Sequence, residues 1–272
     1  MTDTDRYLRR IGVGHASVES LDRGALARLQ RAHVTTVPFE NLAIAGDPWD
    51  RRSGEGVSLD PADLVEKVVE RERGGFCYEL NGAFVELLAD LGFEATRNAG
   101  RIVGDGGIEL PANHLVPTVE LDRTYVTDVG MGAPKARRPV PLDGTAVEDE
   151  AGVAWRVVEN ERPDVDYTVE YRGPDEDSWS DRYVFTHEPR PMEYFTATCD
   201  YLSSAPESTF TGSTFAIIGT ERGHLKLSGR ELSRTDRGEE TVRTLDREEW
   251  DEVIEREFGI EWWQTGTASG EW

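Results

Sequence analysis

The spacing of apolar residues divides the chain into a helical first third and a remainder rich in strands. Apolar residues recur at helical spacing over 64–69, directly after Asp60-Pro61, a pair typical of a helix start. A second helical pattern covers 80–91 and stops at Gly92, a residue favoured at the end of a helix. Shorter patterns of the same kind predict helices over 6–11 and 21–32.

Beyond Gly92, short runs rich in β-branched and aromatic residues predict strands joined by tight turns. The expected strands cover 94–103, 112–121, 124–129, 155–159, 167–171 and 182–186. We interpret this middle part as an antiparallel sheet or a small barrel. The last part is predicted to hold a helix over 192–202, a hairpin of 214–220 with 224–227, a strand over 240–245 and a final helix capped by Asp246 and Glu249. The chain is therefore expected to have an α+β fold.

Acidic residues dominate the composition and are spread along the whole chain. The sequence holds 53 Asp and Glu against 30 Lys and Arg, which gives a net charge of −23, and lysine is scarce. Such an acidic surface suits a halophilic, salt-accumulating host, where salt screens the repulsion between charges. The same surface repels phosphate backbones, so we expect no binding of nucleic acid.

Length and residue counts narrow the class of protein further. A chain of 272 residues can bury a large core, and no apolar run is long enough to span a membrane. The first residues hold no apolar signal region, so we expect a cytoplasmic protein. Two cysteines argue against a disulfide framework, and five histidines without metal-ligand spacing predict no metal site.

Cys77 occupies the most informative position in the sequence. It follows Gly74-Gly75 and begins the second helical pattern, where free backbone N–H groups and the helix dipole favour a thiolate. The two glycines let other groups approach the sulfur closely. A single cysteine in a helical segment is more often a small buried hydrophobe, so position alone leaves both interpretations open.

A cysteine nucleophile needs a base to accept its proton and a third group to orient that base. His114 differs from the other four histidines because it begins a strand that leads directly into a hairpin. The returning strand carries Asp128, a lone acid inside an apolar run, and such a carboxylate is rarely left unpaired. A structural hydrogen bond would also explain Asp128, but one hairpin that carries both residues favours a Cys77–His114–Asp128 site.

The hairpin sets a condition on this site. With a two-residue turn, Asp122-Arg123, His114 and Asp128 would point to opposite faces of the sheet. They share a face only if the turn has an odd number of residues or one strand carries a bulge, and we predict one of these arrangements. Pro117 removes one ladder hydrogen bond, so its strand is expected to be an edge strand or locally irregular.

Several separated motifs, in order, resemble the arylamine N-acetyltransferase family. They are VPFENL at 37–42, RGGFCYELNGAF at 73–84, NHLVPTVEL at 113–121 and YVTDVGMG at 125–132. DYLSSAPESTF at 200–210 and LSGREL at 227–232 look like motifs of the family's third domain. The resemblance implies a helical bundle over 1–92, a β-barrel over 93–189 and an α/β lid over 190–272, around a cysteine-protease-like Cys-His-Asp site.

The resemblance also implies a ping-pong reaction with acetyl-CoA as the donor. Acetyl-CoA would acylate Cys77, coenzyme A would leave, and an arylamine, a hydrazine or an N-hydroxyarylamine would take the acetyl group. The family's catalytic triad falls on Cys77, His114 and Asp128 in this sequence. In this scheme the imidazolium of His114 holds Cys77 as a thiolate, and Asp128 fixes the tautomer of the imidazole.

Further residues are assigned by the resemblance or by their charge. The family's buried Arg–Glu–Arg cluster, which supports the site, falls on Arg10, Glu40 and Arg73. Phe39 matches an aromatic residue of the acceptor pocket, and Phe76 is a second candidate for substrate binding. Lys135 and Arg137 belong to a rare basic cluster, which either meets the phosphates of coenzyme A or forms an ordinary solvated loop.

Two other classes of function remain open at this level. The same three residues would serve a cysteine hydrolase, or an amide synthase that closes an amide from a carrier-bound acyl chain. A non-enzymatic module that binds coenzyme A or an amine, with Cys77 merely buried, is the second class. Acylation of Cys77 by a thioester donor would separate the transferase from a hydrolase that cuts a peptide amide, and slow, pH-independent alkylation of Cys77 would favour the binding module.

Overall fold

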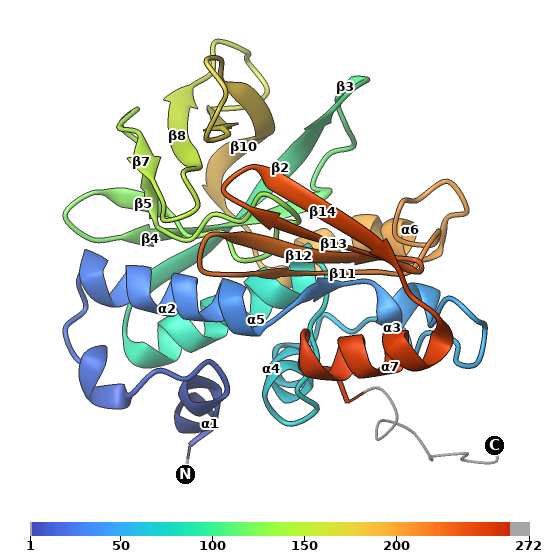
Figure 1. The fold of residues 1–272 in the computed structure, drawn as a ribbon. Helices are drawn as coiled ribbons and strands as arrows, with labels where there is room; N and C mark the ends of the chain where they lie inside the picture. Colours follow the sequence, from blue (N-terminus) through green and yellow to red (C-terminus); the bar gives the residue numbers. More distant parts are fainter. Residues whose placement is uncertain (1, 262–272) are drawn as a thin grey trace.

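The computed structural model describes residues 2–261, and helices fill its N-terminal part as the apolar spacing predicted (Figure 1). These helices are α1 (Asp3–Arg10), η1 (His15–Ser17), α2 (Arg23–Thr36), α3 (Leu42–Ala45), α4 (Pro61–Val69) and α5 (Cys77–Leu91). The predicted start of α4 is confirmed, because the Asp60 carboxylate accepts a hydrogen bond from Ala62 N. The predicted end of α5 is confirmed too, because Gly92 follows its last residue with a φ of 99°. A positive φ of this kind is reached most easily by glycine.

Helix α5 lies at the centre of the molecule. Eleven of its fifteen residues are buried, and it contacts α1 and α4 on one side and strands of the large sheet on the other. Cys77 is its first residue, so the sulfur lies in the interior rather than at the surface. Helix α5 is apolar on most sides, which is typical of a buried helix. Because it is packed on several sides, its position fixes the position of the Cys77 sulfur.

The middle of the chain forms an antiparallel sheet in the order β6-β5-β4-β2-β10-β9-β8-β7. The strands are β2 (Glu94–Gly104), β4 (His114–Glu120), β5 (Thr124–Val126), β6 (Val140–Pro141), β7 (Val147–Glu148), β8 (Ala154–Glu159), β9 (Tyr167–Arg172) and β10 (Ser180–Pro189), while β3 (Gly107–Ile108) pairs with β2 alone. Strands β6 and β8 approach each other, so the sheet curls into a nearly closed barrel. Its interior holds Trp155, Tyr183 and Phe185.

The β4–β5 hairpin meets the condition that the sequence set. Thr118 pairs with Val126 and Glu120 with Thr124, which leaves a three-residue turn over 121–123. The predicted odd-numbered turn is confirmed. His114 and Asp128 therefore lie on the same face of the hairpin, since side chains alternate along a strand.

Pro117 shapes the end of this hairpin. Its strand β4 is an inner strand between β2 and β5, so the expectation of an edge strand was wrong. The alternative, a local irregularity, stays a prediction: β4 pairs with β2 in an unbroken register through Pro117, and on the other side Thr127 N donates to Pro117 O at 3.1 Å. Strand β5 ends at Val126, earlier than predicted, and Asp128 lies in the segment that leaves the sheet.

The last part of the chain forms a second antiparallel sheet, in the order β1-β11-β12-β13-β14. Its strands are β11 (Phe215–Gly219), β12 (Gly223–Ser228), β13 (Glu231–Asp236) and β14 (Glu239–Thr244), joined by β1 (Phe39–Glu40) from the helical part. η2 (Met192–Phe195) and α6 (Thr196–Ser204) precede it, and α7 (Arg247–Arg256), with the predicted Asp246–Glu249 capping box, follows. Strand β13 was missed because its polar residues gave no apolar run.

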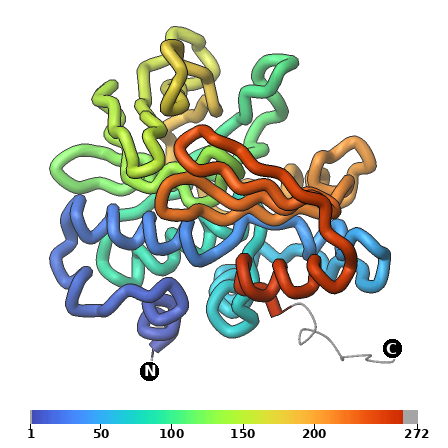
Figure 2. The backbone as a smooth tube through the Cα atoms, in the orientation of Figure 1, coloured from blue at the N-terminus to red at the C-terminus, as the bar shows by residue number. Residues whose placement is uncertain are grey.

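In the view of Figure 2 this second sheet lies above the N-terminal helices, with the final helix α7 below the sheet. Trp250 on α7 packs edge-on against Trp49 of the helical part, with 5.6 Å between ring centroids. Strand β1 pairs with β11, so a sheet crosses from the first part of the chain to the last. The division at residues 92 and 189 stays a prediction, and the last part is described only as far as residue 261. No helix in the described residues combines the length and the apolar character needed to cross a membrane.

Candidate active site

The start of α5 brings Cys77 to the start of β4. The Cys77 side chain is buried, and its thiol lies 3.8 Å from the carbonyl oxygen of Asn113, the residue before His114. Gly130 passes close by, since a Cβ atom placed on Gly130 would lie 2.9 Å from Cys77 Cα. Only glycine allows this approach without a shift of the backbone.

His114 and Asp128 are joined directly. His114 Nε2 lies 2.7 Å from Asp128 Oδ2, and both side chains are almost completely buried. Because Nε2 faces the carboxylate, Nδ1 is the ring nitrogen that remains to accept a proton from a thiol. The aromatic ring of Tyr183 on β10 lies 4.7 Å from the imidazole, centroid to centroid, and limits its rotation.

Asn81 ties these elements together and was missed by the sequence analysis. Its Nδ2 donates to Asp128 Oδ1 at 2.8 Å and to Leu115 O at 2.7 Å, and its Oδ1 accepts from Val129 N at 2.9 Å. Asn81 lies one helical turn after Cys77. The signal that could have found it is a fully buried amide in an otherwise apolar helix, since such a group needs partners.

The electrostatics of Asp128 favour its charged form. Burial raises the pKa of the Asp128 carboxyl, but the charge of His114 and hydrogen bonds from His114, Asn81 and Gly130 N outweigh burial and hold the pKa below its usual range. A buried carboxylate with these donors keeps the imidazole ring in one orientation. It also stabilises an imidazolium when one forms.

The electrostatics of Cys77 differ from the expectation. Burial, together with the negative charge of Asp128, raises the pKa of the Cys77 thiol well above its ordinary value. Backbone N–H groups of Leu115 and Tyr78 oppose this shift but do not overcome it. The helix start alone therefore does not make a thiolate. A thiolate at Cys77 needs a neighbouring cation.

A cluster of aromatic side chains packs around Phe76, the residue before Cys77. Phe39 stacks on Phe215 with 5.5 Å between centroids and meets Phe210 edge-on at 6.2 Å. Phe39 retains 9% exposure, whereas Phe76 is completely buried between Phe210 and Tyr78. Both aromatic candidates for substrate binding are buried, and Phe39 is the one that keeps a small exposed fraction.

The buried charge cluster differs from the one that the sequence predicted. Arg73 pairs with Glu40 at 2.9 Å and with Glu55 at 2.7 Å. Arg10 instead donates to the carbonyl oxygens of Val68 and Glu72, because α1 packs against α4. Lys67, which the sequence analysis did not single out, is the second cation that lowers the pKa of Glu40. It pairs with Glu79 at 2.6 Å.

Glu79 connects this cluster to the start of α5. Its second carboxylate oxygen accepts from Phe76 N at 3.1 Å, directly before Cys77. Glu79 is buried, and burial raises the pKa of its carboxyl in spite of Lys67. The cluster therefore holds the first turn of the helix that carries the sulfur.

The basic cluster after Asp128 is not a solvated loop. Arg137 is buried, pairs with Asp149 at 2.8 Å, and donates to Thr220 O and Gly223 O at the β11–β12 turn. Its guanidinium is fully used within the protein, so the structure argues against contact between Arg137 and a phosphate of coenzyme A. Lys135 is also buried, but its ammonium has no hydrogen-bond partner among the described residues.

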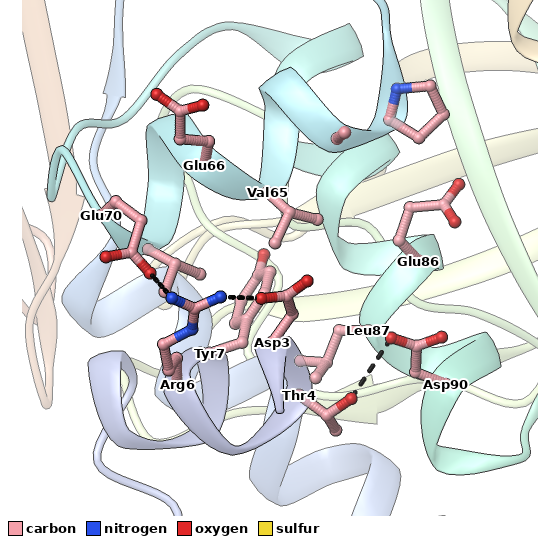
Figure 3. Close-up of a pocket in the computed structure, with 13 residues that line it drawn as sticks. Asp3, Thr4, Arg6, Tyr7, Val65, Glu66, Glu70, Glu86, Leu87 and Asp90 are labelled. Atoms are coloured by element: carbon pink, nitrogen blue, oxygen red, sulfur yellow. Dashed lines mark hydrogen bonds and ion pairs between the residues drawn. The ribbon is translucent and has the colours of Figure 1, made fainter. Parts of the chain in front are cut away.

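A separate cleft of about 560 Å³ lies between α1, α4 and α5 (Figure 3). Its apolar floor includes Tyr7, Val65 and Leu87, and acidic residues surround the floor. Arg6 crosses one side and pairs with Asp3 and Glu70. None of Cys77, His114 and Asp128 lines this cleft, so it is distinct from the site above. In residues 2–261 no group of three potential ligands is placed to hold a metal ion.

Comparison with known proteins agrees with this arrangement. A family model described as N-acetyltransferase matches residues 22–265, which is most of the chain. The chain belongs to this N-acetyltransferase family. An arylamine N-acetyltransferase of Mycolicibacterium smegmatis is 34% identical over 241 residues, which cover 85% of this chain and 82% of that protein.

Two further relatives show how the N-acetyltransferase family varies. The structure of Mycobacterium marinum arylamine N-acetyltransferase in complex with CoA matches with a TM-score of 0.81 and 28% identity, covering 94% of this chain and 92% of that one. Proansamycin X synthase of Amycolatopsis mediterranei is 30% identical over 261 residues, covering 93% and 96%. The predicted family and the α+β fold with its nearly closed barrel are thus confirmed.

Proposed function

We propose that this protein transfers an acetyl group from acetyl-CoA to an arylamine, a hydrazine or an N-hydroxyarylamine through a thioester on Cys77. The observation that carries the proposal is the 2.7 Å contact between His114 and Asp128, directly beside the helix start that bears the sulfur. A base oriented by a carboxylate is what a cysteine nucleophile requires, and this contact supports that role for His114. Membership of the N-acetyltransferase family supplies the reaction class.

The first half-reaction begins with proton transfer from Cys77 to Nδ1 of His114. The thiolate attacks the thioester carbonyl of acetyl-CoA, while the imidazolium is stabilised by Asp128. The tetrahedral oxyanion needs backbone donors, for which the free N–H groups at the start of α5 are suitably placed. The intermediate collapses to acetyl-Cys77, and the departing sulfur of coenzyme A takes the proton from His114.

The second half-reaction reverses these roles. The amine nitrogen attacks the acetyl carbonyl on Cys77, and His114 accepts a proton from that nitrogen. The C–S bond breaks, an amide forms, and the sulfur of Cys77 regains the proton. Exchange of one thioester for another is nearly balanced in energy, so formation of the amide drives the overall reaction.

The decisive experiment is the intact mass of the protein after it is mixed with acetyl-CoA in concentrated KCl without an amine. We expect one added acetyl group, which is lost when an arylamine is supplied. Cys199 offers a matched control, because it is a second buried free thiol. C199S should still be acetylated and C77S should not. An unmodified mass with wild type would refute the proposed donor.

An amide synthase is the second candidate. The similarity over nearly the whole chain to proansamycin X synthase, a relative named as a synthase and not as an acetyltransferase, favours a synthase over a cysteine hydrolase and over a non-enzymatic binding module. Such an enzyme would use the same acyl-Cys77 but a larger acyl group. Acylation of Cys77 by long-chain thioesters, and not by acetyl-CoA, would replace the acetyltransferase proposal with this one.

We also infer a cytoplasmic setting in a salt-accumulating host, with small molecules rather than nucleic acids or membranes as partners. The net charge of −23 supports the salt-rich interior and disfavours polyanionic partners. Free thiols at Cys77 and Cys199 fit a reducing compartment.

A further inference from the structure

Lys135 presents a buried positive charge that nothing in the mechanism uses. Its side chain is 1% exposed, and its ammonium has no hydrogen-bond partner among residues 2–261. The ammonium lies 5.5 Å from the centroid of the Phe39 ring. Burial of an unpaired charge costs free energy, so such a group points to a partner that arrives with a ligand.

The charges around Lys135 do not neutralise it. The carboxylate that acts on its charge is Asp128, whose oxygens already accept from His114, Asn81 and Gly130 N. Arg137 is neutralised by Asp149. Arg182 on β10 donates to Ala133 O and adds a further positive charge that acts on Lys135.

Two histidines are further titratable groups whose pKa depends on the charge of Lys135. They are His33 on α2 and His224 on β12. Burial lowers the pKa of the two imidazoles to about 3 and about 4, and the charge of Lys135 lowers both pKa values further, so both rings are neutral near pH 7. The excess positive charge at this place therefore comes from Lys135 and Arg182, within a protein whose net charge is −23. An anion is the chemical species that fits this site.

The loop from Asp128 to Lys135 places this charge beside Phe39, the aromatic residue that the resemblance assigned to the acceptor. The loop passes Cys77 at Gly130, as described above, and then passes Phe39 at Gly132. A Cβ atom placed on Gly132 would lie 3.8 Å from Phe39 Cε1 and 3.9 Å from Arg182 Nη2. The same aromatic ring therefore has Gly132 and the Lys135 ammonium as neighbours.

We propose that Lys135 binds an anionic substituent, a carboxylate or a sulfonate, carried by the acceptor amine. The inference rests on the proposed function and narrows its acceptors to arylamines that bear a negative charge. With the ring of such an amine against Phe39, its anionic group supplies the partner that the ammonium lacks. The phosphates of coenzyme A are a poorer fit, because the long pantetheine arm holds them far from the thioester.

This arrangement makes the preference dependent on pH. Burial lowers the pKa of Lys135 to about 7, helped by the charges of Arg137 and Arg182 and opposed by Asp128. The ammonium is therefore charged below pH 7 and loses its charge above it. The substituent stays ionised throughout, so the preference for an anionic acceptor should be strongest below pH 7 and should fall above it.

The test compares 4-aminobenzoate with its neutral isostere 4-aminobenzamide as acceptors, at pH values on both sides of 7. The readout is the ratio of the two kcat/KM values, in which the intrinsic reactivity of each amine cancels between variants. We expect K135M to lower this ratio by about tenfold or more, because a charged hydrogen bond is lost. K226M removes an exposed lysine on β12 by the same chemical change and should leave the ratio as in wild type.

Two controls keep the outcomes distinct. The melting temperature of K135M should equal or exceed that of wild type, since an unpaired buried charge is removed. Acetylation of Cys77 by acetyl-CoA, read by intact mass, tests the proposed function separately. An unchanged acceptor ratio in an enzyme that does acetylate Cys77 would overturn the inference. A raised KM for acetyl-CoA with an unchanged ratio would assign Lys135 to the donor and overturn it too.

Discussion

The side-chain amide of Asn81 donates a 2.8 Å hydrogen bond to the carboxylate of Asp128, across 47 positions in the sequence. This contact joins the helix that carries Cys77 to the segment that orients His114. The three candidate catalytic residues come from three separate stretches of chain. Asn81 lies on the same helix as Cys77. Its amide group bonds to Asp128 and to Leu115 O, the carbonyl oxygen of the residue after His114, so it connects all three stretches.

Replacement of Asn81 by alanine tests this role. N81A leaves Val129 N and Leu115 O without their buried partner and removes one donor from Asp128. We expect a loss of about 3 kcal/mol in the free energy of unfolding and a lower rate of Cys77 acetylation. Denaturant titration and intact mass measure the two effects. N160A, at a partly buried site in the barrel, should cost clearly less, and equal losses would refute the assignment.

Replacement of Gly130 by alanine tests the close approach at the sulfur. The new Cβ atom would lie 2.6 Å from Asn81 Nδ2 and 2.9 Å from Cys77 Cα, so the backbone of one segment must shift. We expect activity to fall by at least tenfold, since small displacements at a reacting centre are costly. G106A is the control, because nothing lies within 4 Å of its Cβ position. If G130A were as active as G106A, the site would have to be looser than the structure shows.

Replacement of Asp128 by asparagine tests the orientation of His114. D128N keeps the size of the side chain but removes the charge that stabilises an imidazolium. By analogy with serine hydrolases, whose Asp→Asn variant is the worked case behind this figure, we expect acetylation of Cys77 to slow by about a thousandfold or more. D105N, at an exposed turn, controls for the chemical change. Rapid single-turnover acetylation in D128N would remove Asp128 from the site.

Arg137 and Arg138 form a matched pair for a stability measurement. Arg137 holds buried Asp149 and the β11–β12 turn, whereas Arg138 makes an exposed ion pair with Glu150. R137M leaves Asp149 buried without its partner and should lower the free energy of unfolding by about 3–5 kcal/mol. R138M should change it by less than about 1 kcal/mol. Similar values for the two variants would show that Arg137 does not join the barrel to the second sheet.

The acidic surface predicts a dependence of stability on salt. Raising KCl from about 0.1 M to about 1 M shortens the screening length from about 10 Å to about 3 Å and weakens repulsion across the surface. We expect the melting temperature to rise by roughly 5 °C or more, which corresponds to about 1–2 kcal/mol for a chain of this size. Calorimetry in both buffers measures this change in melting temperature. Full stability in salt-free buffer would contradict the halophilic setting.

Local signals in the sequence predicted the elements well. Asp60 and Asp246 marked helix starts, and Gly92 marked a helix end, because capping depends on a few neighbouring backbone groups. Strand β13 was missed because strand pairing, and not its own residues, creates it. The odd-numbered turn between His114 and Asp128 was also predictable, since the alternation of side chains along a strand is a local rule.

The sequence by itself determined which residues are proposed to carry the chemistry. Cys77, His114 and Asp128 were singled out by residue type, by local position and by the resemblance to a known family. Only the tertiary structure decided what surrounds them: that Lys67 rather than Arg10 acts on Glu40, that Asn81 ties the site together, and that Lys135 is buried without a partner. The physical reason is that burial and pairing depend on which distant segments pack together. Contacts of that kind leave no periodic or local trace in one chain.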